Sequence, residues 1–197
     1  MTGQSLTERR KRETRYDIAK AAMSLFARDG FDQVGADEIA AEAGVSVRTF
    51  YRYFPGKDET LSPIIAKGTA ELASAIEARP APEPLAVAVQ AAYSEISSGA
   101  GLENVHTLIR LLIETPVLRA GWLGELRDIE ESLASVVLKR TRGLSAEDAR
   151  LTAATIVAAL RLTLERSTRM GSSEPLADAL GASLRYLSDG AHLQGGR

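Results

Sequence analysis

Apolar residues recur every three to four positions along most of the chain, which is the spacing of one face of an α-helix. The alternation typical of a β-strand is missing, and Ala, Leu, Glu and Arg, which favour helices, dominate. The first clear stripe lies in residues 13–31, where Gly30 marks the helix end and the apolar face consists of Ile18, Ala22, Leu25 and Phe26. The pattern predicts an all-α protein.

Two short helices follow this first helix. Gly35 is the expected N-cap of the first short helix, and Gly44 ends it. Ser46 then caps a second short helix, which runs to the turn at Pro55-Gly56. Two short helices joined by a turn that contains glycine, next to a longer supporting helix, describe a helix-turn-helix.

The second short helix is rich in aromatic rings, because residues 44–54 hold four of the nine Phe and Tyr residues of the chain. On a helical wheel Val47, Phe50 and Phe54 share one face, and we expect this face to pack against the preceding helices. The remaining positions lie opposite this face or at its edge: Arg48, Thr49, Tyr51, Arg52 and Tyr53.

Exposed Arg and Tyr on a short helix suit DNA, since Arg bonds guanine edges or phosphates and Tyr bonds phosphate or contacts a thymine methyl. The alternative is that Tyr51 and Tyr53 only cover the rim of the core. A basic run precedes the first helix, and we expect it to be a disordered arm that lies along DNA phosphates or in the minor groove when bound. A solvated tail is the alternative for this run, which consists of Arg9, Arg10, Lys11 and Arg12.

Composition excludes several kinds of site. The chain has no cysteine, and its two histidines, His106 and His192, lie far apart in sequence, so we expect no metal site and no cofactor. No nucleophile elbow or phosphate-binding glycine loop is present, which argues against an enzyme built on a helical bundle. No apolar run is long enough to span a membrane and the N-terminus has no signal-peptide pattern, so we expect a cytoplasmic location.

The rest of the chain also has the pattern of helices. Asp58 is the expected cap of a helix that runs to about Ala78, and further stripes lie in residues 85–96, 105–112 and 122–137. Ser145 begins a long helix that runs to about Met170. We therefore expect a DNA-binding domain over residues 1–57 and a larger helical bundle over residues 58–197.

The helix at 146–170 is apolar on most faces, which indicates burial on more than one side. A second apolar surface next to small residues of the last helix suggests a subunit interface, and a monomer with a fully internal helix is the alternative. The expected interface stripe on the last helix consists of Leu176, Leu180, Leu184 and Leu187.

Residues 39–61, IAAEAGVSVRTFYRYFPGKDETL, resemble the signature of the TetR family of bacterial transcriptional regulators. The matching positions are Ala43-Gly44-Val45-Ser46, Thr49, Tyr51, Tyr53, Phe54, Lys57 and Leu61. The resemblance implies that Tyr53 and Lys57 hold phosphate, and that a second group faces the major groove: Ser46, Val47, Arg48, Thr49 and Tyr51. The chain departs from the family at Gly35, where a Thr usually caps the helix and contacts a phosphate.

Residues 103–161, and ETPVLRA at 114–120 above all, resemble the C-terminal domain of mycofactocin-regulator-like TetR proteins. This resemblance implies a hydrophobic or amphipathic effector, bound in a mostly apolar cavity that holds a few polar groups. Candidate contacts are Tyr93, His106, Arg110, Glu114 and Trp122. The spacing of His106, Arg110 and Glu114 is also that of a solvated row on one helix face.

These observations together predict a homodimeric repressor that binds double-stranded DNA at a palindromic operator and is released by a small effector. In the TetR family the last two long helices of each subunit build a four-helix dimer interface, which agrees with the expected interface here. The alternative is a constitutive DNA-binding protein, or an activator, without small-molecule control.

Overall fold

The structure is a computed structural model that describes residues 6–98, 102–170 and 175–188. Within these residues the chain is helical and contains no strand, which confirms the predicted fold class. The elements in chain order are α1 (Leu6–Asp29), η1 (Phe31–Gln33), α2 (Ala36–Glu42), α3 (Val47–Tyr53), η2 (Lys57–Glu59), α4 (Ser62–Ala78), α5 (Leu85–Ser98), α6 (Leu102–Glu114), α7 (Pro116–Arg140), α8 (Ala146–Met170) and α9 (Leu176–Ser188), where η marks a 3-10 helix.

The chain forms two compact units. One consists of Met1–Gly68 and Arg110–Gly124, and the other of Thr69–Ile109 and Glu125–Arg197. The boundaries between them fall inside α4, α6 and α7. The first unit therefore also contains residues 110–124, which the sequence pattern assigned to the C-terminal domain.

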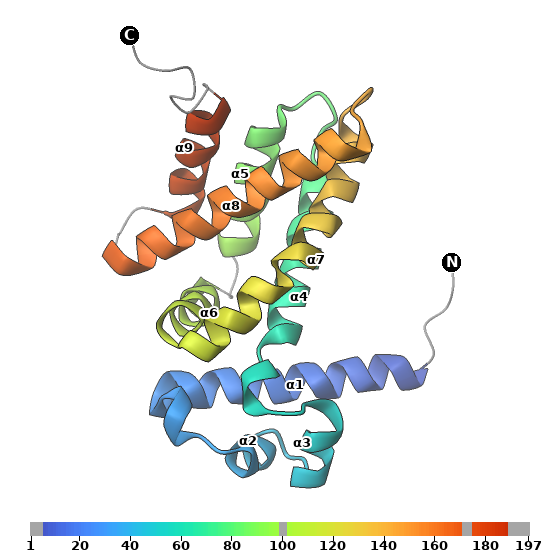
Figure 1. Cartoon of the computed structure of the whole chain (residues 1–197). Coiled ribbons are helices and arrows are strands. Elements are labelled where there is room, and N and C mark those ends of the chain that lie inside the picture. Colours follow the sequence, from blue (N-terminus) through green and yellow to red (C-terminus); the bar gives the residue numbers. More distant parts are fainter. Residues whose placement is uncertain (1–5, 99–101, 171–174, 189–197) are drawn as a thin grey trace. The chain divides into compact units, whose positions relative to one another are not determined.

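The first unit contains the predicted helix-turn-helix. In Figure 1, α2 and α3 lie against the long helix α1. The core between these helices is built from the stripe expected on α1 and from the apolar side of α2 and α3, and its fully buried members include Ile18, Ala22, Phe26, Ile39, Phe50 and Phe54. Burial of such side chains stabilises each by roughly 1.5–3 kcal/mol relative to exposure, so three rings and their neighbours hold this unit together.

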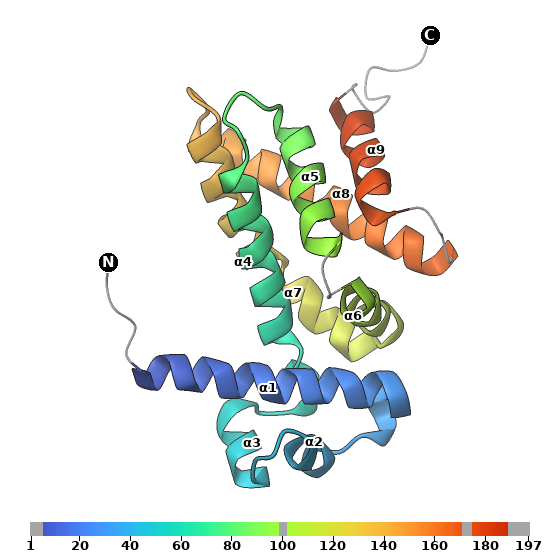
Figure 2. The same ribbon diagram turned by 180° about the vertical axis from the view of Figure 1, so that it is seen from behind.

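The second unit is a helical bundle in which α9 packs on both α5 and α8 (Figure 2). Gly181 leaves room for the Gln90 side chain of α5, because a Cβ at position 181 would collide with the Gln90 amide group. Between α8 and α9 the hydroxyl groups of Thr163 and Ser183 lie 2.9 Å apart and share a hydrogen bond. The buried Thr163 hydroxyl is thus paired, as burial requires.

Two helix starts differ from the prediction. Helix α1 begins at Leu6, so the basic run at 9–12 is helical and is not a disordered arm. Arg9 and Glu13, four residues apart, form an ion pair of 3.5 Å, and Lys11 and Glu8, three residues apart, form one of 2.9 Å. Ion pairs with these spacings stabilise a helix. Asp58 lies in η2, and α4 starts only at Ser62.

The leucine stripe of α9 faces the interior of its own subunit. Leu176, Leu180 and Leu184 are buried, and only Leu187 remains exposed. The first three leucines hold α9 to α5 and α8, so they are not available to a partner chain, which corrects their predicted place in a dimer interface. One apolar stripe is what a helix needs to bind its own bundle.

Candidate nucleic-acid interface

The turn between α2 and α3 is set by Gly44. This residue has φ of +66°, a left-handed conformation that glycine adopts without a steric penalty. The backbone N–H groups of Gly44 and Val45 donate to the carbonyls of Ala41 and Ala40 at 3.0 and 2.9 Å. These bonds satisfy the last carbonyls of α2 and turn the chain directly into α3.

The start of α3 is fixed by two hydroxyl groups. Ser46 is the N-cap, and its Oγ accepts a hydrogen bond from the backbone N–H of Thr49 at 3.1 Å. The Thr49 hydroxyl lies 2.9 Å from the same oxygen. Such a cap stabilises a helix by about 1 kcal/mol. Both residues were predicted to face DNA, and the structure shows that both also hold the first turn of α3.

The aromatic residues of α3 divide as predicted. Phe50 and Phe54 are fully buried, with ring centroids 5.9 Å apart. Tyr51 is 57% exposed, Arg48 and Arg52 are exposed, and Tyr53 is half-buried. The Arg52 guanidinium lies over the Tyr53 ring, 5.0 Å from its centroid.

Val47 was predicted to share the buried face, but it is 42% exposed. It is the first residue of α3, and side chains in a helix tilt toward its N-terminus. A side chain in the first turn therefore projects past the helix end and away from the core. The exposed residues Val47, Arg48, Tyr51 and Arg52 form what we call the outer face of α3.

The first turns of α1 add positive charge near the end of α3. The pKa of Lys11 is raised, mainly by its hydrogen bond and charge interaction with Glu8, and to a lesser degree by Tyr53. Arg52 opposes this rise through charge repulsion, which places Lys11 within electrostatic range of the end of α3. The basic run, predicted as an arm, thus belongs to α1.

Lys57, expected to hold phosphate, forms hydrogen bonds within the fold. Its Nζ donates to the backbone carbonyls of Phe31 at 2.7 Å and Val34 at 2.9 Å, and it lies 4.4 Å from the centroid of the Phe31 ring. Two of the three ammonium hydrogens are therefore bonded to the segment that leads into α2. Lys57 first of all positions this segment, and at most one hydrogen remains for a phosphate.

Gly35 caps α2 without a side chain. Its φ of −95° lies in the extended region, so the backbone does not require glycine here. Its N–H donates to the Glu38 carboxylate at 2.7 Å, which satisfies this group without a hydroxyl. A Cβ at this position would meet the Asp37 carboxylate. The Asp37 carboxylate would therefore have to shift to admit the threonine that is usual in the family.

Sequence reasoning missed the role of Arg15. Its guanidinium lies 5.2 Å from the centroid of the Phe54 ring and donates to the Ser62 hydroxyl at 3.3 Å. Arg15 thereby joins α1, the end of α3 and the first residue of α4. The signal in the sequence is its position three residues before the buried Ile18, which places Arg15 at the edge of the apolar face.

The candidate effector residues lie in different environments. His106, Arg110 and Glu114 are exposed on α6, as the alternative of a solvated row predicts. Trp122 is buried in the first unit. Tyr93 is 8% exposed in the second unit, and its hydroxyl oxygen is buried without a hydrogen-bond partner in the described part of the chain.

The environment of Tyr93 keeps its hydroxyl protonated. Burial raises the pKa of Tyr93 above its ordinary value, and the nearby Ser97 hydroxyl opposes this rise. Ser97 donates its hydrogen to the backbone carbonyl of Tyr93 at 2.7 Å. The Tyr93 hydroxyl therefore carries a proton that it can donate to another molecule.

Residues 6–98, 102–170 and 175–188 contain no cluster of His, Asp and Glu that could hold a metal ion, and His192 lies outside them. Among the same residues, no helix is long and apolar enough to cross a membrane.

Two family models match this chain. The model of bacterial regulatory proteins, tetR family, matches residues 18–62, and the model of the MftR C-terminal domain matches residues 80–192. The first match covers the helix-turn-helix and the second half of its supporting helix α1. The second covers most of the C-terminal bundle.

Similar proteins of known name are transcriptional regulators and not enzymes. The chain is 35% identical to the HTH-type transcriptional regulator TcmR of Streptomyces glaucescens over 156 residues, which cover 74% of this chain and 68% of that protein. It is 26% identical over 192 residues to MftR of Mycobacterium tuberculosis, a regulator assigned to mycofactocin biosynthesis, with 96% and 97% of the two chains covered.

Solved structures share the fold. FadR of Thermus thermophilus, a TetR family repressor in complex with lauroyl-CoA, matches with a TM-score of 0.62 and 24% identity, covering 89% of this chain and 94% of that chain. FadR of Bacillus subtilis, in complex with stearoyl-CoA, matches with a TM-score of 0.60 and 20% identity, covering 89% of this chain and 98% of that chain.

The internal bonds of Lys57 lead to a prediction about stability. Lys57→Met should lower the free energy of unfolding by about 1–3 kcal/mol, because two carbonyls lose a charged donor in a part-buried position. Lys11→Met, which removes only an exposed pair with Glu8, should change it by less than about 0.5 kcal/mol. Urea unfolding followed by circular dichroism measures both, and equal effects would contradict the assignment.

Proposed function

The chain belongs to the TetR family of bacterial regulatory proteins, and we propose that it is a homodimeric repressor released from a palindromic operator by a small hydrophobic or amphipathic effector. The observation that carries the proposal is the outer face of α3. It exposes two arginines and a tyrosine on a helix whose phenylalanines are fully buried. A rigid helix that presents such side chains fits the major groove of DNA.

The residues near this helix divide into two roles. The outer face of α3 contacts base edges, with Ser46 and Thr49 at its start. Lys11 and its basic neighbours on α1, together with Tyr53, contact phosphates, which position the protein without specifying sequence. Lys57 contributes to phosphate binding only with the hydrogen that its two backbone bonds leave over.

The dimer forms through an apolar surface on α8 and α9, which we call the α8–α9 face. Its Leu162 and Tyr186 are 54% and 53% exposed, and it surrounds a hollow of about 600 Å³ whose small residues allow a second backbone to approach. The residues of the face that we use here are Ala158, Leu162, Ala182, Tyr186 and Leu187. Contiguous exposed apolar side chains of this kind mark protein interfaces, and a second copy of this chain would cover them.

The effector binds within the second unit and accepts a hydrogen bond from Tyr93. A buried hydroxyl without a partner costs about 1–3 kcal/mol, and a bound molecule with an acceptor oxygen would remove this cost. The match to the MftR C-terminal domain and the acyl-CoA ligands of the two FadR proteins support an effector with an acyl chain and a polar group.

The two roles near α3 predict different effects on DNA binding. Arg48→Ala should cost about 1–3 kcal/mol on the preferred operator and relax its sequence preference, because a base contact is lost. Lys11→Met should weaken binding to all sequences alike. It should also reduce the slope of log affinity against log salt concentration by about 1, the value of one phosphate contact. An operator selected from random DNA, followed by titration at several salt concentrations, tests this. A change in base preference in Lys11→Met alone would reverse the assignment.

The α8–α9 face predicts the assembly. Leu162→Glu should give monomers by sedimentation, with unchanged circular dichroism and little affinity for the palindrome, whose half-sites lie about 34–36 Å apart or a multiple of this distance. The matched control is Val87→Glu, since Val87 is 48% exposed on α5 and lies outside the hollow, and it should stay dimeric. A monomeric wild type at micromolar concentration would exclude the proposed dimer.

The buried hydroxyl of Tyr93 predicts opposite effects on ligand binding and stability. Tyr93→Phe should bind a lauroyl-CoA probe about 2- to 12-fold more weakly, the effect of one hydrogen bond of about 0.5–1.5 kcal/mol, while the melting temperature of the free protein stays equal or rises. Calorimetry and thermal unfolding measure these quantities. If lauroyl-CoA and acyl-CoA probes of other chain lengths neither bind nor release operator DNA, the protein lacks this control and is the constitutive alternative.

A further inference from the structure

Helix α8 carries a second apolar stripe on the side that its own bundle leaves uncovered. Leu151 is 68% exposed and Leu162 is 54% exposed. Between them Ala158 is exposed and Thr155 is half-buried, and the Thr155 hydroxyl donates to the Leu151 carbonyl at 2.8 Å. One turn beyond each leucine the helix surface carries a charged residue. We call the six residues on this side the α8 stripe: Glu147, Leu151, Thr155, Ala158, Leu162 and Arg166.

The order of residues in the α8 stripe is symmetric. Its members are separated by four, four, three, four and four residues, so the spacing is the same from either end. A small residue lies on each side of the centre, and a leucine lies one turn further out on each side. Glu147 at one end is negative and Arg166 at the other is positive. A two-fold rotation about an axis that crosses α8 between residues 156 and 157 therefore brings leucine to leucine and opposite charges together.

A second copy of the chain fits this symmetry. In a two-fold dimer both subunits use the same surface, so each contact between two different residues occurs twice. Two α8 helices that run antiparallel across the axis place Leu151 against the partner's Leu162, and Thr155 against the partner's Ala158. The central pair is small, and the distance between packed helices depends on the side chains at their contact. The two helices can therefore approach closely at the axis.

Two hollows beside the α8 stripe fit the same pairing. One of about 600 Å³ is lined by Leu162, one of about 360 Å³ is lined by Leu151, and Thr155 lines both. An antiparallel partner helix places the partner's Leu151 beside the first hollow and the partner's Leu162 beside the second. Packed helices insert side chains of one helix into hollows on the other, which this arrangement allows on both sides of the axis.

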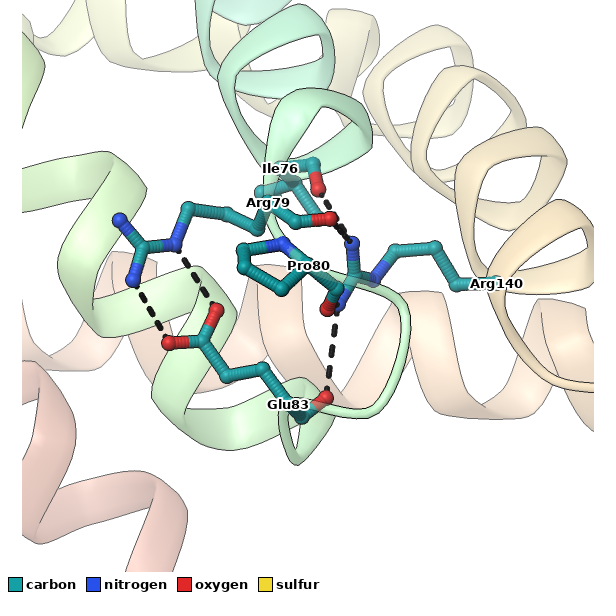
Figure 3. Close-up of polar contacts among 5 residues, drawn as sticks. All are labelled: Ile76, Arg79, Pro80, Glu83 and Arg140. Atoms are coloured by element: carbon teal, nitrogen blue, oxygen red, sulfur yellow. Dashed lines mark hydrogen bonds and ion pairs between the residues drawn. The ribbon is translucent and has the colours of Figure 1, made fainter.

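The charged ends of the α8 stripe are not paired inside their own chain. Other cations of the second unit are: Arg140 donates to the Arg79 carbonyl at 2.7 Å, and Arg79 pairs with Glu83 at 2.6 Å (Figure 3). Glu147 and Arg166 are exposed and make no hydrogen bond or ion pair with the rest of the described chain. Both are therefore available to a partner chain.

Arg166 also differs from the other arginines in the second half of α8. Arg161 and Arg169 form ion pairs with Glu165 at 2.8 and 3.0 Å. Arg166 instead lines the hollow beside Leu162. Across the two-fold axis it lies opposite the partner's Glu147, and the same pair occurs a second time with the two chains exchanged.

We infer that Glu147 and Arg166 are specificity-determining residues of self-association, which form two reciprocal ion pairs across an antiparallel pair of α8 helices. This inference rests on the proposed function, in which the α8–α9 face forms the dimer, and it extends that face to Leu151 and Glu147. Charges at the edge of a helix pair determine partner and orientation more than affinity. The chain thereby selects a second copy of itself in one register.

Reversal of the charges distinguishes this register from others. Glu147→Arg alone and Arg166→Glu alone each turn two attractive contacts into two repulsive ones, so each should dimerise roughly 5- to 100-fold more weakly by sedimentation. A mixture of the two variants should form heterodimers, because one chain has arginine at both positions and the other has glutamate at both. Native mass spectrometry of the co-expressed chains, one with a size tag, measures the excess over random pairing. Screening in about 1 M salt should reduce this excess.

Two further variants are the controls. The double variant Glu147→Arg, Arg166→Glu keeps both pairs with their charges exchanged, so it should dimerise like the wild type, which also shows that the altered helix folds. Arg150→Glu changes an exposed residue of α8 outside the stripe and should remain a homodimer. Random pairing of the two single variants, or a double variant weaker than both, would overturn the inference. A monomeric wild type would instead contradict the proposed dimer, and the inference with it.

Discussion

A helix of seven residues is too short to be stable in water, and the candidate DNA-reading helix α3 has this length. The burial of Phe50 and Phe54 against the neighbouring helices is therefore the interaction on which the rest of the site depends. It gives α3 a fixed orientation, and the orientation decides which of its side chains remain exposed. The Ser46 cap and the Gly44 turn refine its start, but each contributes less than the two buried rings.

Several cations among the described residues make contacts inside the fold that a count of charges does not reveal. Lys57 and Arg140 bond backbone carbonyls, and Arg15 bonds a hydroxyl and lies over an aromatic ring. Backbone carbonyls outside regular helix positions need donors, and a long basic side chain reaches them from another segment. Lys57 therefore has fewer hydrogens left for DNA than the sequence suggests, and in the proposed function the charge that contacts DNA lies mainly on the outer face of α3 and the first turns of α1.

Two features of the single chain are unfavourable unless something binds. The α8–α9 face exposes apolar side chains around a hollow, and Tyr93 has a buried hydroxyl without a partner in the described residues. Native proteins tolerate such features mainly where function requires them. A partner subunit and an effector are the molecules that would satisfy the first and the second feature. Both belong to the larger, C-terminal part of the chain, which the MftR C-terminal model matches.

The sequence alone determined the helical class, the helix-turn-helix and the division of its rings, because these depend on local periodicity and on turn residues such as Gly44. The family signature identified the same helix from nearby residues in the chain. Tertiary structure decided the rest. From the sequence, Leu180 could have faced its own bundle or a partner subunit. Val47 could have faced the core or solvent, and Lys57 could have bonded a phosphate or a backbone carbonyl. In each case the neighbours come from distant parts of the chain, and the Arg140 side chain likewise donates to a carbonyl about 60 positions earlier. Periodicity shows which residues share a face, but only packing shows what that face contacts.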